Sequence, residues 1–217
     1  MDAAREAILS QVCAALGRTR GADAPPVPST VRVGPRLPSP PAAEVEQLLQ
    51  EIEKLSGKTR RLAGPEALQA ALAELVRIEA VKRATCWTTP DLRAWRVAPL
   101  LQNLGVELVP AQADKRLVAS CELGVTGASA ALPETGTLVL TSSPEQPRVV
   151  SLLPRVHLAL VRPSVLRADL HQVFEETRAA GYMVLVTGPS RTADIELTLT
   201  LGVHGPKSLY VWLMEEG

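Results

Sequence analysis

A short polar segment directly after an apolar run carries the side chains best suited to binding a ligand. Residues 188–192 read Gly-Pro-Ser-Arg-Thr, and residues 182–187 before them are almost entirely apolar, as in a buried strand. Backbone N–H groups, two hydroxyls and the Arg191 guanidinium could hold an anion there. Alternatively, the segment is only a turn, and Arg191 pairs with Asp194 or Glu196. We favour the ligand site, because open α/β sheets bind ligands beyond the carboxyl ends of their strands.

Two Gly- and Thr-rich motifs form a second candidate region. Gly-Val-Thr-Gly occupies residues 124–127, and Glu-Thr-Gly-Thr occupies residues 134–137. Glycine lets a ligand approach the backbone closely, and Glu134 could act as a nucleophile or a base. The alternative is a tight hairpin with a solvated Glu134. The candidate ligand-binding residues of both regions, with one histidine from a glycine-flanked turn, are Thr126, Gly127, Thr135, Gly136, Thr137, Ser190, Arg191, Thr192, Asp194 and His204.

The histidines and cysteines show no spacing that would hold a metal ion or a cluster. Cys13, Cys86 and Cys121 are far apart, and no C-x-x-C pair occurs. His157 lies inside an apolar run and is interpreted as a core histidine, and His171 lies on a helix. We therefore expect no metal and no cofactor on this chain.

Composition excludes two broad classes of partner. Lys and Arg together number 23, as do Asp and Glu, so no excess positive charge attracts nucleic acid or an anionic membrane. The apolar stretches are too short or too interrupted to span a bilayer. The first residues carry acids where a secretory signal would carry basic residues. We expect a cytoplasmic protein that binds no nucleic acid.

The first forty residues differ in character from the rest. Residues 1–17 have an amphipathic helical pattern, and seven prolines follow between Pro25 and Pro41. The sequence therefore predicts an N-terminal helix and proline-rich arm over residues 1–40, separable from an α/β domain with a leading helix over residues 41–217.

Helix and strand patterns alternate from residue 58 onward, which favours a mainly parallel sheet covered by helices. Residues 123–141 predict a strand, a turn at residues 133–136 and a returning strand. A helix over residues 164–177, with Ser164 as its cap, joins two apolar runs in a predicted βαβ unit. The predicted strands are 84–88, 106–109, 156–161, 182–187, 194–201 and 208–214.

Four of these motifs in order resemble the LUD family, in its lactate-utilisation protein C branch. They are Gly124 to Leu138, Ser151 to His157, Gly188 to Glu196 and Gly202 to Pro206, and the similarity runs over about residues 44–215. The resemblance implies the three-layer α/β sandwich of the sugar-phosphate isomerase and CoA-transferase superfamily. It also implies a part in oxidising L-lactate to pyruvate within a three-protein assembly. Because this chain lacks ferredoxin-like cysteine motifs, the iron–sulfur proteins would be its partners.

Three functions remain open at this point. The first is an accessory or substrate-handling component of that iron–sulfur system, with Arg191 holding a small carboxylate. The second is an acyl- or CoA-transferase-like enzyme that uses Glu134, and the third is a non-catalytic interaction module. Whichever holds, we expect Thr126, Glu134, Ser190, Arg191 and Asp194 to line one pocket.

Overall fold

The computed structural model describes residues 2–19, 34–193, 199–202 and 204–215. Contacts within the chain divide it into two compact units, Met1–Gly34 and Pro35–Gly217. The first unit holds α1 (Asp2–Ala15), whose apolar residues Ile8, Leu9 and Val12 are exposed. The second unit holds the α/β domain, and the remaining description concerns this unit.

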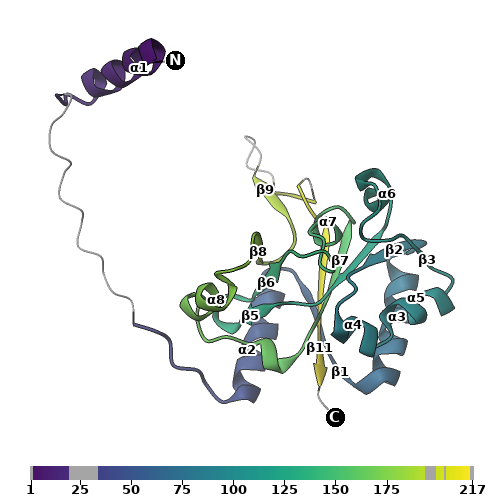
Figure 1. Ribbon diagram of the computed structural model, residues 1–217. Helices are drawn as coiled ribbons and strands as arrows, with labels where there is room; N and C mark the ends of the chain where they lie inside the picture. The colour runs from purple at the N-terminus through teal and green to yellow at the C-terminus, as the bar shows by residue number, and fades with distance from the viewer. Residues whose placement is uncertain (1, 20–33, 194–198, 203, 216–217) are drawn as a thin grey trace. The chain divides into compact units, whose positions relative to one another are not determined.

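A six-stranded parallel sheet forms the centre of the domain, which confirms the predicted α/β class (Figure 1). Its strands, in spatial order, are β1 (Lys58–Ala63), β11 (Ser208–Glu215), β7 (Val156–Val161), β4 (Leu123–Thr126), β2 (Arg83–Cys86) and β3 (Glu107–Leu108). All six residues of β7 are buried. A strand covered on both faces needs a continuous apolar run, and this is why residues 156–161 were recognisable in the sequence.

Helices cover one face of this sheet. The helices are α3 (Gly64–Ile78), α4 (Pro90–Ala94) and α5 (Val97–Asn103). Pro65 suits the first turn of α3, and Leu68, Leu72 and Leu75 form its buried stripe. These helices pack on alternate residues of the central strands, such as Leu158 and Trp212.

The opposite face is covered by α2 (Pro41–Lys54) and by a small second sheet. Leu48 and Ile52 of α2 pack with Ala159 of β7 and Val211 of β11. Figure 1 shows α2 on one side of the main sheet and α3, α4 and α5 on the other. Helices, sheet and a mixed third layer together make the sandwich predicted from the sequence.

The small sheet is antiparallel and has the strand order β5-β6-β8. Its strands are β5 (Ala130–Leu132), β6 (Thr137–Thr141) and β8 (Met183–Val186), and η1 (Pro133–Thr135) joins the first two. The predicted turn at residues 133–136 is therefore correct. The predicted βαβ unit is wrong, because β8 pairs with β6 and not with the parallel sheet. Its apolar run lies at an edge and is only partly buried.

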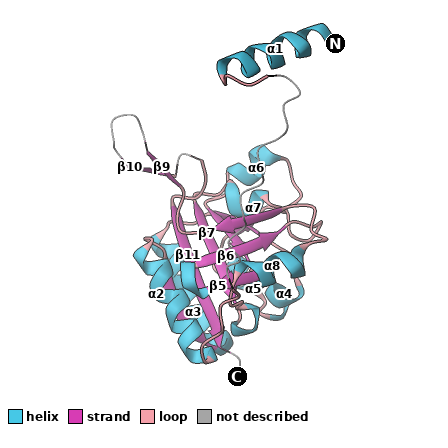
Figure 2. Cartoon of the chain, turned by 90° about the vertical axis from the view of Figure 1, so that its left-hand side faces the viewer, coloured by secondary structure: helices cyan, strands magenta, loops and turns pink. Residues whose placement is uncertain are grey.

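The predicted helix over residues 164–177 is also shorter than expected. A 3-10 turn, η2 (Pro163–Val165), comes first, and α8 is Leu170–Thr177. Asp169 caps α8, since its carboxylate accepts a hydrogen bond from the Gln172 N–H. Val173 packs on the small sheet, whereas Phe174 is 51% exposed. Figure 2 shows α8 beside β5 and β6.

The remaining elements are short. They are α6 (Lys115–Ala119), α7 (Val149–Leu152), and the two-stranded pair β9 (Arg191–Ala193) and β10 (Leu199–Leu201). The predicted strand 194–201 overlaps β10, and its residues 194–198 lie outside the described residues. Across the described part of the chain, no helix has the length and apolar character that a membrane crossing requires.

Candidate functional site

A cavity of about 320 Å³ lies beside the amino ends of β7 and β11, against the small sheet. We call it the His157 cavity. Its lining residues are Ser151, Leu152, His157, residues 184–190, residues 204–206 and Leu209. Three of the four sequence motifs contribute to this lining, and the fourth contributes Thr126 behind it. Segments far apart in the sequence thus converge on one cavity.

His157 is a buried polar residue in the lining of this cavity. Its side chain is 1% exposed, and its Nε2 atom lies 2.8 Å from Thr126 Oγ1 within hydrogen-bond distance. Among the described residues, Nδ1 has no hydrogen-bond partner. Burial lowers the pKa of His157 to about 4, so the imidazole is neutral near pH 7. The sequence interpretation of a satisfied core histidine is therefore only half right, because one ring nitrogen has no partner among the described residues.

Gly124 lies opposite His157 on the neighbouring strand and allows α7 to pack closely on the sheet. The two residues are paired across β4 and β7, and a Cβ atom on Gly124 would lie 1.9 Å from the Val150 carbonyl oxygen of α7. This glycine brings α7 onto the sheet, where Ser151 reaches the cavity and its hydroxyl donates to the Arg148 carbonyl. The sequence interpretation of Gly124 as space for a ligand is replaced by a packing role.

Two loops border the cavity and are hydrogen-bonded to each other. The Ser190 N–H donates to the Pro206 carbonyl at 3.0 Å, and the Gly202 N–H donates to the Ser190 carbonyl at 3.0 Å. His204, in the second loop, is exposed and lines the cavity. Ser190 and His204 are thus polar side chains at its border.

A second cavity, of about 370 Å³, lies on the outer face of the small sheet. We call it the Glu134 cavity, and its lining includes Glu134, Asp169 and three threonines. The hydroxyls of those threonines form a chain, with 2.7 Å from Thr135 to Thr137 and 2.9 Å from Thr137 to Thr187. Leu185 and Thr187 line both cavities, so β8 and the residue after it separate them.

Glu134 itself is a surface residue. Its side chain is 61% exposed, and its carboxylate lies 3.9 Å from Arg36 Nε. Gly136 beside it has φ +61°, and an added Cβ would lie 2.7 Å from the Ile52 backbone nitrogen. Gly136 therefore lets η1 approach α2, and the close approach serves packing between elements.

Among the described residues, the members of the single predicted pocket do not share one cavity. Glu134 lines one cavity and Ser190 the other, while Thr126 lies behind His157. Arg191 lines neither cavity, because its guanidinium donates to the Leu55 carbonyl at the end of α2. The reason is topological: β8 belongs to the small sheet, so the loop after it does not lie at the carboxyl end of the main sheet.

The remaining candidate residues lie nearby or beyond the described part. Gly127 is partly exposed directly after β4, and Thr192 belongs to β9. Asp194, and Glu196 as a possible partner of Arg191, lie outside the described residues. His171 is exposed on α8. Burial raises the pKa of Cys86 to about 12 and that of Cys121 to about 11, so both thiols stay protonated at neutral pH.

A third cavity lies where the fold alone would place a ligand. It measures about 350 Å³, and Trp87 and Pro110, which line it, follow the carboxyl ends of β2 and β3. Most of its lining is apolar, with Leu92, Val97 and Leu108 as examples. It offers few groups that could orient a polar molecule.

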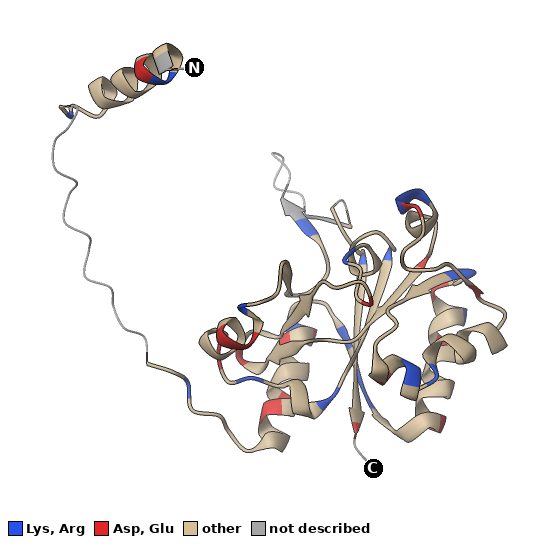
Figure 3. Ribbon diagram, viewed as in Figure 1, with Lys and Arg blue, Asp and Glu red and all other residues tan. Residues whose placement is uncertain are grey.

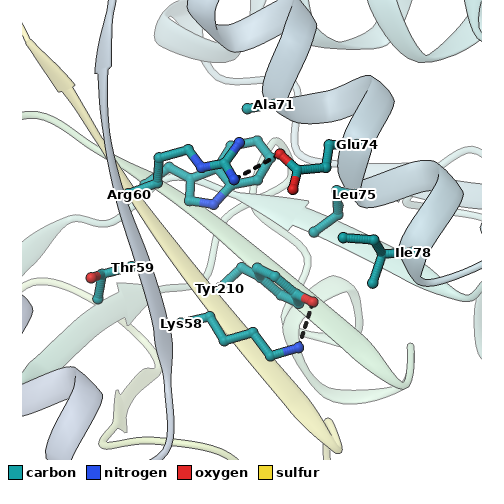
Figure 4. Close-up of a pocket in the computed structure, with 9 residues that line it drawn as sticks. Lys58, Thr59, Arg60, Ala71, Glu74, Leu75, Ile78 and Tyr210 are labelled. Carbon is teal, nitrogen blue, oxygen red and sulfur yellow. Dashed lines mark hydrogen bonds and ion pairs between the residues drawn. The ribbon is translucent and has the colours of Figure 1, made fainter.

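A groove at the edge of the main sheet was missed in the sequence. This Lys58 groove, of about 220 Å³, lies between β1, β11 and α3 (Figure 4). The Lys58 ammonium donates to the Tyr210 hydroxyl at 2.7 Å, and that hydroxyl donates to Glu79 at 2.6 Å. Arg60 pairs with Glu74 at 2.7 Å. Burial would raise the pKa of Glu79, but hydrogen bonds from Tyr210 and Arg155 and the charge of Lys58 lower it overall.

The chain is similar to known proteins over most of its length. The family model described as LUD domain matches residues 45–214. An uncharacterized protein of Neisseria meningitidis is 42% identical over 95 residues, which cover 42% of this chain and 41% of that protein. A lactate utilization protein C of Shouchella clausii is 32% identical over 155 residues, which cover 66% of this chain and 68% of that protein. The solved structure of a DUF162 family protein from Deinococcus radiodurans has the same fold, with a TM-score of 0.63 at 21% identity over 82% of this chain and 99% of that one.

Proposed function

The chain belongs to the LUD domain family, and from that premise we propose that it serves lactate utilisation as a substrate-handling component. Its partners in this proposal are iron–sulfur proteins, which take the electrons when L-lactate is oxidised to pyruvate in the cytoplasm. The relatives that carry the name lactate utilization protein C support the general role. The alignment spans 68% of one of these relatives and 66% of another, so their whole activity comes to this chain only as a proposal.

One observation carries the choice of site: the buried Nδ1 of His157 has no partner among the described residues. Leaving a buried polar atom unpaired costs about 1–3 kcal/mol, and a ligand in the adjacent cavity could supply the missing bond. We propose that the ligand is lactate or pyruvate, with its hydroxyl or keto oxygen at Nδ1. A neutral imidazole can donate to the keto oxygen or accept from the hydroxyl, depending on its tautomer.

The carboxylate of this ligand needs a different partner from the one expected in the sequence. Arg191 donates to Leu55 and does not reach the His157 cavity. Ser190, Thr187 and His204 are polar side chains on the loops that border the cavity. We propose that these groups orient the carboxylate, and that the chain binds and presents substrate without a cofactor of its own. The three cysteines lack the spacing of a cluster site.

The enzyme alternative, acyl transfer through Glu134, has less support. Glu134 is mostly exposed and faces Arg36, and the glycine beside it serves contact with α2. A carboxylate nucleophile works best where water is excluded from the site. The geometry therefore favours the His157 cavity over Glu134.

The test is a titration of the whole chain with L-lactate and with pyruvate, followed by NMR or calorimetry. His157→Gln keeps an amide near the position of Nε2 but removes the Nδ1 group, and we expect it to weaken binding by about tenfold or more, the scale of one hydrogen bond. His157→Asn, which keeps a polar atom near Nδ1, should retain part of the affinity. His171→Gln, on exposed α8, is the matched control. Equal binding by wild type and His157→Gln would refute the site.

A further inference from the structure

The strand β8 has a free edge in the described part of the chain. It is the last strand in the order β5-β6-β8, and its residues 183–186 pair with 138–141 of β6. The Ser142 N–H donates to the Tyr182 carbonyl at 3.1 Å, which fixes the alternation of the antiparallel ladder. Val184 and Val186 therefore direct their backbone groups toward β6. Met183, Leu185 and Thr187 direct theirs outward.

This edge lacks the features by which proteins usually protect an exposed strand. Residues 182–187 contain no charged residue and no proline, and Leu185 is 41% exposed. The edge strand β1 of the main sheet differs, since it carries Lys58, Arg60 and Arg61. Charged side chains on an edge prevent pairing with a further strand. The β8 edge is therefore the one of these two that can accept a strand.

A cavity lies on each face of this edge. Leu185 and Thr187 line the Glu134 cavity on the outer face, and residues 184–190 line the His157 cavity on the inner face. Successive side chains of a strand point to opposite faces. A strand added beside β8 would therefore place alternate side chains into the Glu134 cavity and over the mouth of the His157 cavity.

The two cavities differ in chemistry, and this identifies the kind of strand that fits. The outer cavity presents the carboxylates of Glu134 and Asp169 and the threonine hydroxyls. Arg36 lies 3.9 Å from Glu134 but also pairs with Glu44, so carboxylates still outnumber the cation here and the cavity suits a further basic side chain. Acidic residues of α8 lie on the same side of the molecule (Figure 3). The inner cavity presents Val184, Val186 and Leu209 near β8, which suit an apolar side chain.

We propose that the β8 edge docks an extended segment of a partner protein in which basic and apolar residues alternate. Main-chain hydrogen bonds to Met183, Leu185 and Thr187 hold the segment, and the two cavities select its side chains. A second copy of β8 fits less well, because it would place Leu185 or Thr187, neither of them cationic, against the outer carboxylates. The inference goes beyond the proposed function, and it rests on that function only in assigning the chain a protein partner.

The probe is a blocked synthetic peptide of alternating lysine and valine, with a glutamate and valine peptide as its charge control. Titrated into the full chain and followed by NMR, the lysine peptide should shift the amide signals of Met183, Leu185 and Thr187. Leu185→Lys puts an ammonium of the chain itself beside the outer carboxylates and should weaken the peptide by about tenfold. Thr59→Lys, which adds a lysine to the β1 edge, is the matched control and should leave binding unchanged.

Three results would overturn the proposal. The first is the absence of shifts at these amides with millimolar lysine peptide, and the second is equal binding of the glutamate peptide. The third is a dimer of the chain alone, measured by light scattering, that Leu185→Lys dissociates, because the occupant would then be a second copy. The lactate titration reports on His157 and the peptide titration on β8, so a failure of one is distinguishable from a failure of the other.

Discussion

The Lys58 groove and the His157 cavity both lie near the amino ends of the parallel strands, yet their polar groups are organised in opposite ways. In the groove, Lys58, Glu79 and Tyr210 satisfy one another within hydrogen-bond distance. In the cavity, His157 is more deeply buried and keeps one ring nitrogen without a partner in the described chain. A closed set of partners stabilises the fold, whereas the open nitrogen of His157 is the feature on which the proposed binding site rests. The predictions below test this contrast.

The largest expected effect is a loss of stability between pH 6.5 and about pH 4. Burial lowers the pKa of His157 to about 4, while the unfolded chain binds the same proton near 6.5. The unfolded state therefore binds more protons in this window, so the contribution is fully present above pH 6.5 and is lost as the pH falls. We expect a loss of about 3 kcal/mol in total, at up to about 1.4 kcal/mol per pH unit.

Urea unfolding at pH 7.0, 6.0 and 5.0, about the upper part of that window, measures this slope. His157→Gln should remove most of it. The groove and the cavity should lose stability in different pH ranges. The pKa of Glu79 is lowered from a value near 4.5, so its contribution to stability is lost only at lower pH. An unchanged slope in His157→Gln would show that the cavity is not the origin.

The next largest effect is expected from breaking the hydrogen-bond network of the Lys58 groove. Glu79→Ala removes the acceptor of the Tyr210 hydroxyl and of Arg155, and leaves those groups partly buried without it. We expect a loss of about 2 kcal/mol in the free energy of unfolding. Glu74→Ala breaks the more exposed pair with Arg60 and should cost less than about 1 kcal/mol. Equal losses for both would contradict the idea of a closed network.

A smaller effect is expected for the coupling energy between the paired side chains of Thr126 and His157. His157→Leu alone leaves the Thr126 hydroxyl buried without its partner, whereas Thr126→Val with His157→Leu removes both groups. Replacing both partners by apolar groups can be nearly neutral. The double variant should therefore lose about 1 kcal/mol less free energy of unfolding than the two single variants together. A double-mutant cycle from urea unfolding measures this coupling, and strict additivity would refute it.

The smallest effect is expected from removing residues 1–34. The boundary between the two compact units falls after Gly34. Arg36 belongs to the second unit, where it bonds to Ala168, Asp169 and Glu44. A chain that begins at Pro35 should therefore unfold within about 0.5 kcal/mol of the full chain and bind lactate equally well, the range of changes away from packed features. A chain that begins at Pro41 would also lose Arg36. A large fall in the Pro35 chain would show that the first unit contributes to the domain.

Sequence patterns located the elements whose local chemistry decides their structure. The apolar run of β7 and the break at residues 133–136 were correctly interpreted, because burial on two faces and a turn each leave a local signal. β8 was placed in the wrong sheet, since an apolar run does not say which strand it pairs with. The polar edge strand β1 carries no such signal and was missed.

The candidate site was predictable in its segments but not in its centre. The loops at Ser190 and His204 do line a cavity, whereas the Arg191 guanidinium donates to the Leu55 carbonyl at the end of α2. His157 resembled an ordinary core residue, because the state of each ring nitrogen depends on contacts between distant segments. Only the structure shows that Thr126 satisfies one nitrogen and leaves the other.

Gly124 and Gly136 each face the backbone of another element at a distance that leaves no space for a methyl group. Any larger residue at either position would displace α7 or α2, whatever the protein binds. During evolution, these two glycines should therefore resist replacement even in a lineage that has lost its ligand, while Ser190 and His204 would drift once selection for binding ends. Retained glycines without the retained polar residues would mark a relative that keeps the scaffold but has a different activity.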